Sequence, residues 1–175
     1  MYSNKPDKII VHHTGGTDAN PLADTSHHTF KIVDDFHRAK GWGKIGYHYF
    51  IEKSGKLTQG RADNEEGAHT IGQNRTSLGV CLAGNFDATL PTPEQVDTLR
   101  KLLKEKCTQY SIPAAQIFPH RHFSSKSCYG KNLTHDWARA LVEGEPKNDD
   151  EEVKKLSLWV QILQLRIKIF QLLRR

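Results

Sequence analysis

The sequence predicts an α/β domain followed by a separate C-terminal helix. Short apolar runs with the length of buried strands alternate along the chain with segments whose apolar residues recur at helical spacing. The composition changes after Glu143, where a polar, acidic stretch precedes a densely apolar one. We therefore expect one globular domain over residues 1–143, a linker over 144–152 and an amphipathic helix over 153–175.

Four segments have the composition of β-strands. Residues 8–13 form an apolar run that ends in two histidines, and residues 77–83 form a second buried run. Residues 47–53 are expected to pair with residues 57–61, because the Ser54-Gly55 dipeptide between them is typical of a hairpin turn.

The first expected helix covers residues 26–40. Ser26 is expected to cap its start, and Gly41 is expected to end it. Phe30, Val33 and His37 share one face at helical spacing, so this face is expected to pack on the sheet.

The second expected helix begins at Thr92. Pro93 suits its first turn, and Gln95 completes a capping box with Thr92. Its apolar stripe consists of Val96, Leu99, Leu102, Leu103 and Cys107. A short last helix is expected over residues 133–142.

Charge and cysteine content restrict the class of protein only broadly. The net charge of +5 favours anionic partners without choosing among them. Cys81, Cys107 and Cys128 are odd in number and widely spaced, so no disulfide framework is expected, and Cys81 is expected to be a core residue. The N-terminus lacks the apolar stretch of a signal peptide, so we expect synthesis in the cytoplasm.

Several residues could ligate zinc. His120 and Cys128 lie in one loop, P-H-R-H-F-S-S-K-S-C, and offer the nitrogen and thiolate that zinc prefers. A catalytic zinc has three protein ligands, so a third must come from elsewhere. His12 and His13 end the first strand, and alternation allows only one of them to face this loop easily.

Four segments in order carry a resemblance to a known family. They are K-I-I-V-H-H-T-G-G, G-W-G-K-I-G-Y-H-Y-F-I, G-A-H-T-I-G-Q-N-R-T-S-L-G-V-C-L-A-G-N-F and H-R-H-F-S-S-K-S-C. Together they closely resemble the N-acetylmuramoyl-L-alanine amidase family, which includes phage amidase endolysins and peptidoglycan-recognition proteins. The similarity covers residues 8–142 and implies a central mixed β-sheet flanked by helices.

The resemblance also implies roles for individual residues. The implied zinc ligands are His12, His120 and Cys128. Tyr47 and Lys126 match catalytic-site residues of the phage enzymes, whereas His69 and Asn74 are expected to line the substrate groove. Many non-catalytic recognition proteins of this family lack the cysteine ligand, so Cys128 favours an enzyme over a binder.

The implied activity is zinc-dependent hydrolysis of the amide between N-acetylmuramic acid and L-alanine in peptidoglycan. As a phage endolysin, the protein would be made in the host cytoplasm and would act on the cell wall. The alternative is a non-catalytic peptidoglycan-binding module with a structural or vestigial metal site. His122 and Tyr129 stand where family members often have Asp and Pro, so His122 stays open as a supporting donor or an alternative ligand.

The remaining histidines and two glutamates are expected to have no role at the metal site. His48 alternates to the opposite side of its strand from Tyr47. Glu65 and Glu66 could shuttle protons, but we expect them in a solvated acidic turn. The other histidines expected on helix surfaces are His27, His28, His37 and His135.

The apolar residues of the C-terminal helix follow heptad spacing, from Val153 to Phe170. Three roles are open for it: self-association, contact with a membrane surface, or packing on its own domain. A membrane-spanning role is disfavoured by Arg166 and Lys168, and no nucleic-acid partner is expected.

Overall fold

The structure, a computed structural model, describes residues 3–17 and 19–144. A five-stranded sheet has the order β3-β2-β4-β1-β5. Neighbours pair in parallel except for β2 and β3, which form the antiparallel hairpin expected from the turn between them. This confirms the mixed sheet. The strands are β1 (Lys8–His13), β2 (Tyr49–Ile51), β3 (Leu57–Gln59), β4 (Ser77–Leu82) and β5 (Ile117–Pro119).

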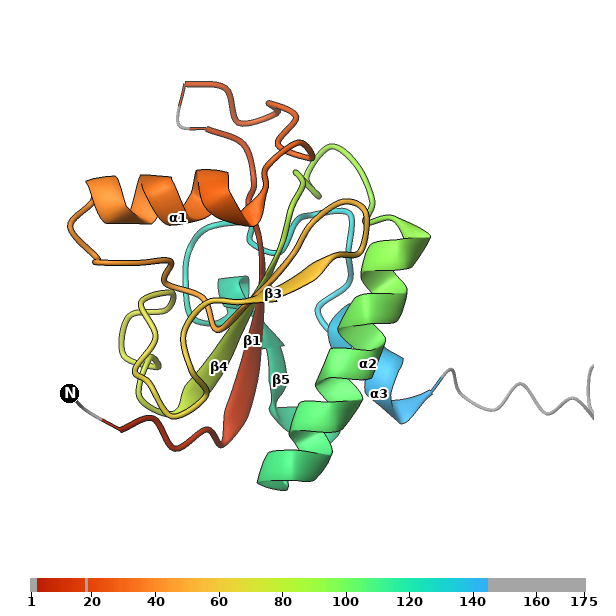
Figure 1. Ribbon diagram of the computed structural model, residues 1–175. Helices are drawn as coiled ribbons and strands as arrows, with labels where there is room; N and C mark the ends of the chain where they lie inside the picture. Colours follow the sequence, from red (N-terminus) through yellow and green to blue (C-terminus); the bar gives the residue numbers. More distant parts are fainter. Residues whose placement is uncertain (1–2, 18, 145–175) are drawn as a thin grey trace, which may run out of the picture. The chain divides into compact units, whose positions relative to one another are not determined.

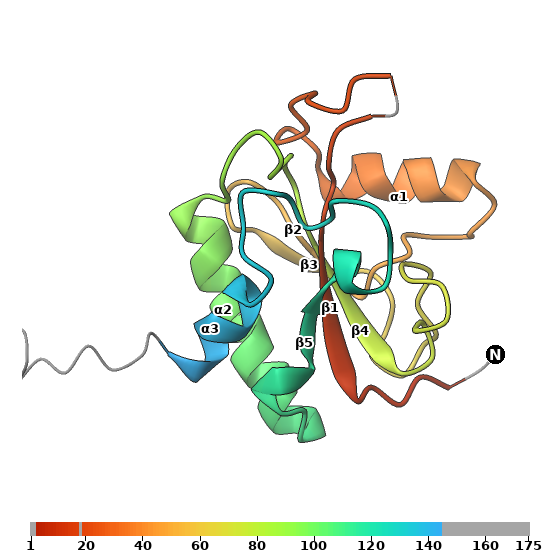
Figure 2. The same ribbon diagram turned by 180° about the vertical axis from the view of Figure 1, so that it is seen from behind.

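Helices cover both faces of the sheet. Helix α1 (Phe30–Ala39) lies on one side, and α2 (Pro93–Tyr110) and α3 (Trp137–Glu143) lie on the other (Figures 1 and 2). Two short 3-10 turns, Ala114–Gln116 and His120–His122, flank β5. The layering confirms the α/β class predicted from the alternation of strand and helix patterns.

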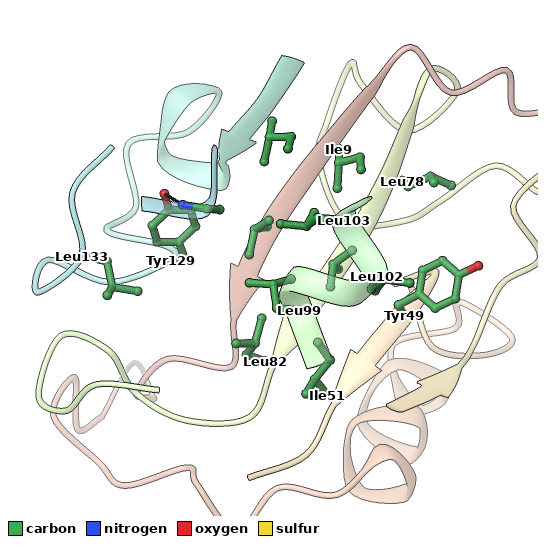
Figure 3. Packing of buried hydrophobic residues seen from close by; sticks show 14 of the residues in the cluster. Ile9, Tyr49, Ile51, Leu78, Leu82, Leu99, Leu102, Leu103, Tyr129 and Leu133 are labelled. Atoms are coloured by element: carbon green, nitrogen blue, oxygen red, sulfur yellow. Dashed lines mark hydrogen bonds between the residues drawn. The ribbon is translucent and has the colours of Figure 1, made fainter. Parts of the chain in front are cut away.

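The larger core lies between the sheet and α2. Leu99 and Leu103 have no exposed surface, and they face strand residues that include Ile9 and Leu82 (Figure 3). Leu102 joins them at 3% exposure, but Val96 and Cys107 of the expected stripe are only half-buried. Helix α2 is thereby fixed on the face away from α1.

A smaller apolar cluster lies on the opposite face of the sheet. Phe50 and Cys81 from the strands pack there against Val33 of α1, which confirms the expected core position of Cys81. His12 is the pairing partner of Cys81 in the neighbouring parallel strand, so their side chains share this face. Alternation also places Gly79 on it.

The expected helix starts were right for α2 and wrong for α1. Thr92 and Gln95 form the predicted capping box. Helix α1 is capped by Thr29 rather than Ser26, whose backbone N–H instead donates to the Asp24 carboxylate. This local turn removes Ser26 from the helix.

Much of the predicted C-terminal organisation lies outside the described residues. The expected helix over 153–175 and all of the linker except Gly144 fall there, so both stay predictions, as does the domain boundary. Helix α3 begins four residues later than expected, at Trp137. Among the helices of residues 3–144, none is long and apolar enough to cross a membrane.

Candidate metal centre and active site

The carboxyl ends of two adjacent parallel strands bring two histidines together. His12 lies near the end of β1, and His120 follows β5 directly. The register pairs Val11 with Pro119, so the next residue on each strand is one of these histidines. Their ring centroids are 4.4 Å apart. Ligand sites in open α/β sheets favour this carboxyl edge.

The loop after His120 returns to place Cys128 beside the same edge. Asp87 anchors this loop, because its carboxylate accepts hydrogen bonds from the Ser127 hydroxyl and the Lys131 backbone N–H. The Cys128 sulfur lies 3.7 Å from His12 Nδ1. Ligand atoms of His12, His120 and Cys128, the metal trio, all lie within 4.8 Å of one another. The structure thus brings together the three ligands implied by the resemblance.

Burial sets the protonation of the trio. It lowers the pKa of His12 well below the ordinary value, with His69 and His120 adding to the effect. The pKa of His120 is also lowered, first by burial and then by the charge of Lys126. Both imidazoles are therefore neutral and can offer a lone pair.

The sulfur of the trio needs a nearby positive charge. Burial raises the pKa of the Cys128 thiol to about 12, which disfavours the thiolate in the metal-free protein. A divalent cation coordinated by the trio would offset that cost. Two neutral nitrogens and one sulfur therefore fit a metal ion.

His13 and His122 do not share the trio. The His13 ring packs beside Phe86 and accepts the backbone N–H of that residue at Nδ1 over 2.9 Å. His122 stacks on Phe118, and its Nδ1 lies 3.2 Å from Nε2 of His135. Strand alternation therefore separated His12 from His13 correctly, and the structure places His122 away from the trio.

Tyr47 and Lys126 lie beside the trio. The Tyr47 ring is 5.1 Å from that of His12, between centroids. Burial raises the pKa of its phenol well above 10, so the hydroxyl stays protonated and can donate a hydrogen bond. Lys126 is exposed in the loop, and its charge acts to lower the pKa of both His120 and Cys128.

His69 and Asn74 occupy different positions relative to the trio. His69 Nδ1 lies 3.1 Å from His12 Nε2, in direct contact with the expected ligand. The Asn74 side-chain oxygen accepts the backbone N–H groups of His69 and Thr70, each over 2.9 Å. Its carbonyl group therefore bonds within the loop, and its contact with the trio is indirect.

The expectation that His37 lies on a helix surface was wrong. It is 6% exposed, and its Nδ1 accepts the Gly46 backbone N–H over 3.0 Å. Burial lowers its pKa to about 4. The other three histidines were also expected on helix surfaces. His27, His28 and His135 instead lie just before a helix.

The sequence did not predict a hollow that is lined in part by Gly67, the neighbour of the His69 ring. It has a volume of about 550 Å³, and Gly67 in its wall lies directly against the His69 ring. Glu65 lines it in an ion pair with Lys44 at 2.6 Å. Its full lining is Trp42, Gly43, Lys44, Arg61, Glu65, Glu66 and Gly67. Glu65 and Glu66 are therefore parts of a hollow, and both are paired with basic residues.

Comparisons with known proteins identify the family of this chain. The endolysin of Klebsiella phage KP32 is 35% identical over 112 residues, which are 61% of this chain and 73% of that protein. Peptidoglycan-recognition protein SD of Drosophila melanogaster is 30% identical over 153 residues, 86% of this chain and 78% of that protein. The N-acetylmuramoyl-L-alanine amidase LysC from Clostridium intestinale has a similar structure, with a TM-score of 0.70 and 28% identity over 80% of this chain and 87% of that one. Because the sequence pattern of N-acetylmuramoyl-L-alanine amidases matches residues 2–131, the chain belongs to that family.

Proposed function

We propose that this protein is a zinc-dependent peptidoglycan amidase of the phage endolysin type. It hydrolyses the amide between N-acetylmuramic acid and L-alanine in the bacterial cell wall. The observation that carries the proposal is the convergence of two neutral imidazoles and a cysteine at one sheet edge, in a chain of the amidase family. The phage assignment rests on similarity to several phage endolysins.

The donor set favours zinc among divalent ions. His12 and His120 would contribute nitrogen and Cys128 would contribute sulfur, a combination that suits zinc better than the oxygen-preferring Mg²⁺ or Ca²⁺. Three protein ligands would also match the number that catalytic zinc sites have. When bound, zinc supplies Lewis acidity that polarises the amide carbonyl and activates water near neutral pH.

The chain's own side chains complete the reaction. Negative charge develops on the carbonyl oxygen as the amide is attacked, and the exposed ammonium of Lys126 stabilises that charge. Tyr47 keeps its proton, so its hydroxyl donates to the same oxygen or orients the attacking water. The hollow of about 550 Å³, whose wall residue Gly67 packs against His69, is the place we assign to part of the glycopeptide.

A non-catalytic peptidoglycan-binding module is the second candidate, because recognition proteins are also among the relatives. Cys128 favours the enzyme, since it would supply the third protein ligand that a catalytic zinc site has. Membrane contact or self-association through residues 153–175 would be an additional property under either candidate.

Product analysis on purified cell walls distinguishes the two candidates. The enzyme should release stem peptides with a free L-alanine amine and create no new reducing sugar ends. A chelator should stop the release, and added zinc should restore it. Walls that stay intact after zinc loading, with peptidoglycan still bound, would support the binding module instead.

A further inference from the structure

Two glycines form a slot for the His69 ring. A side chain at Gly79 of β4 would place its Cβ 2.5 Å from the ring carbons, and one at Gly67 would come within 2.6 Å. Real Cβ atoms essentially never approach so closely, so the imidazole occupies space that only glycine leaves free. The slot lies on the sheet face that also carries His12.

The loop that carries His69 is closed by Asn74. Its side-chain oxygen binds the N–H groups of His69 and Thr70, and its backbone carbonyl accepts the N–H of Gly67 over 3.1 Å. One residue therefore fixes the backbone on both sides of His69. Rotation of the imidazole out of the slot would have to work against this clamp.

The hydrogen bonds of the His69 ring define its tautomer. Nε2 lies 3.4 Å from the Ser77 hydroxyl oxygen. That hydroxyl donates its own proton to the Gln73 carbonyl over 2.7 Å, so its oxygen is left to accept one from His69 Nε2. Nδ1 then carries a lone pair, and it points at His12 Nε2 and the Thr70 hydroxyl, 3.1 and 3.0 Å away.

The two nitrogens of His12 have different neighbours. Nδ1 lies 3.7 Å from the Cys128 sulfur and so faces the metal trio, whereas Nε2 faces His69 and Thr70. A neutral histidine that ligates through Nδ1 carries its proton on Nε2. That proton needs an acceptor, and the lone pair of His69 Nδ1 provides one. Such partners fix the tautomer and orientation of ligating histidines in metal sites generally.

We propose that His69 is a positioning residue for the metal centre. Its imidazole, seated between Gly67 and Gly79, accepts the Nε2 proton of His12 and holds His12 as an Nδ1 ligand. This inference rests on the proposed function only in requiring that the trio binds a metal ion. It assigns His69 a role in metal affinity, which a residue that only contacts substrate would not have.

Three substitutions at position 69 test the acceptor directly. In His69→Asn the amide oxygen can take the place of Nδ1, whereas in His69→Gln the amide lies nearer the place of Nε2, and His69→Ala has neither. We expect Gln and Ala to weaken zinc affinity about 10- to 100-fold and Asn to stay within about 3-fold of the wild type. His122→Ala is the matched control, since that histidine pairs with His135 away from the trio.

Zinc affinity is measured on the full-length protein by competition with a chromogenic chelator, and the absorption spectrum of Co²⁺-loaded protein reports the ligand geometry. Circular dichroism of each metal-free variant checks the fold, and the Asn and Gln pair carries the comparison if Ala unfolds. Equal affinities for wild type, Asn and Gln would overturn the role of His69 while leaving the amidase intact. A wild-type protein that binds no metal would overturn the metal centre itself.

Discussion

The backbone N–H of His13 donates a hydrogen bond to the sulfur of Cys128 over 3.4 Å, although 115 positions separate the two residues. Strand β1 therefore serves the metal trio twice, through the side chain of His12 and the backbone of the next residue. A backbone donor to sulfur favours the charged thiolate, and it acts here against the effect of burial. The last two residues of one strand thus prepare two of the three ligands.

Replacing Cys128 with Ala should abolish both stoichiometric zinc and wall hydrolysis, because two imidazoles alone hold zinc weakly. Metal analysis of the purified protein and release of dye from labelled walls measure the two effects. Cys107→Ala is the control, since Cys107 is half-buried against the core on α2. Full zinc content in Cys128→Ala would show that the ligand set is wrong.

Replacing Lys126 with Ala should lower kcat on the order of 10²-fold, since the ammonium stabilises charge that exists only in the transition state. Zinc content should stay unchanged, because Lys126 is no ligand in the trio. Lys131→Ala, which removes another exposed lysine nearby, should keep wild-type kinetics. A change in KM alone would assign Lys126 to substrate binding.

Replacing Tyr47 with Phe should lower kcat on the order of 10²-fold and leave thermal stability nearly unchanged. The substitution removes only the hydroxyl and keeps the ring between His12 and His37, whose centroids lie 5.1 and 5.5 Å away. Steady-state kinetics and thermal unfolding of zinc-loaded protein measure both quantities. If Tyr47→Phe keeps the wild-type kcat, the role of Tyr47 is packing and not catalysis.

Asp63→Asn should destabilise the fold by about 2 kcal/mol at pH 7, because it removes the buried one of the two ion-pair partners of Lys106 and leaves only the exposed Glu105. The Asp63 carboxylate lies 3.1 Å from the Lys106 ammonium and accepts hydrogen bonds from the Tyr49 and Tyr110 hydroxyls. Asp97→Asn, in an exposed pair with Arg100, should cost less than about 1 kcal/mol. Urea unfolding measures both.

The cost of Asp63→Asn should also depend on pH in a definite direction. Burial would raise the pKa of Asp63, but hydrogen bonds from Tyr49, Lys106 and Tyr110 outweigh it and hold this pKa below 3.8. The unfolded state therefore binds the proton first as pH falls. The stability difference between wild type and variant should be complete above about pH 5 and should shrink as pH falls below about 4. A difference that grows toward pH 3 would contradict the ion pair.

Removing residues 144–175 should preserve hydrolysis of purified walls, because the sheet, its cores and the metal trio lie within residues 3–143. Light scattering and lysis of intact cells then identify the role of the removed segment. Loss of an oligomer would assign it to self-association, whereas lost action on intact cells at unchanged mass would assign it to membrane contact. Loss of hydrolysis of purified walls would contradict the predicted domain boundary.

The sequence predicted the parts of the fold whose signals are local. Strands β1 and β4 and the capping box of Thr92 follow from short runs of residues. Strand β5 was missed because three residues show no periodicity. By residue type Ser26 is a slightly better cap than Thr29, and the turn at Asp24 overrides that preference.

The sequence indicated which residues belong to the site, but it did not indicate which of them contact one another. Alternation along β1 correctly reduced two histidines to one, but the choice of His12 came from family resemblance. The burial of His37 depends on a backbone N–H nine positions away, and the contact of His69 with His12 spans 57 positions. Neither contact leaves a pattern in the sequence, because each depends on how distant segments pack.

The core between α2 and the sheet lies on the opposite face from His12 and the His69 slot. The larger part of the apolar core and the proposed reacting groups therefore lie on opposite sides of the sheet, and only the smaller cluster around Phe50 and Cys81 shares the face of His12. An engineer who wants longer shelf life can rework the α2 side, where Leu99 and Leu103 lie, and leave the reacting side alone. Conversely, substitutions that change which peptidoglycan is cut can be made on the His12 side without altering the core that packs on α2.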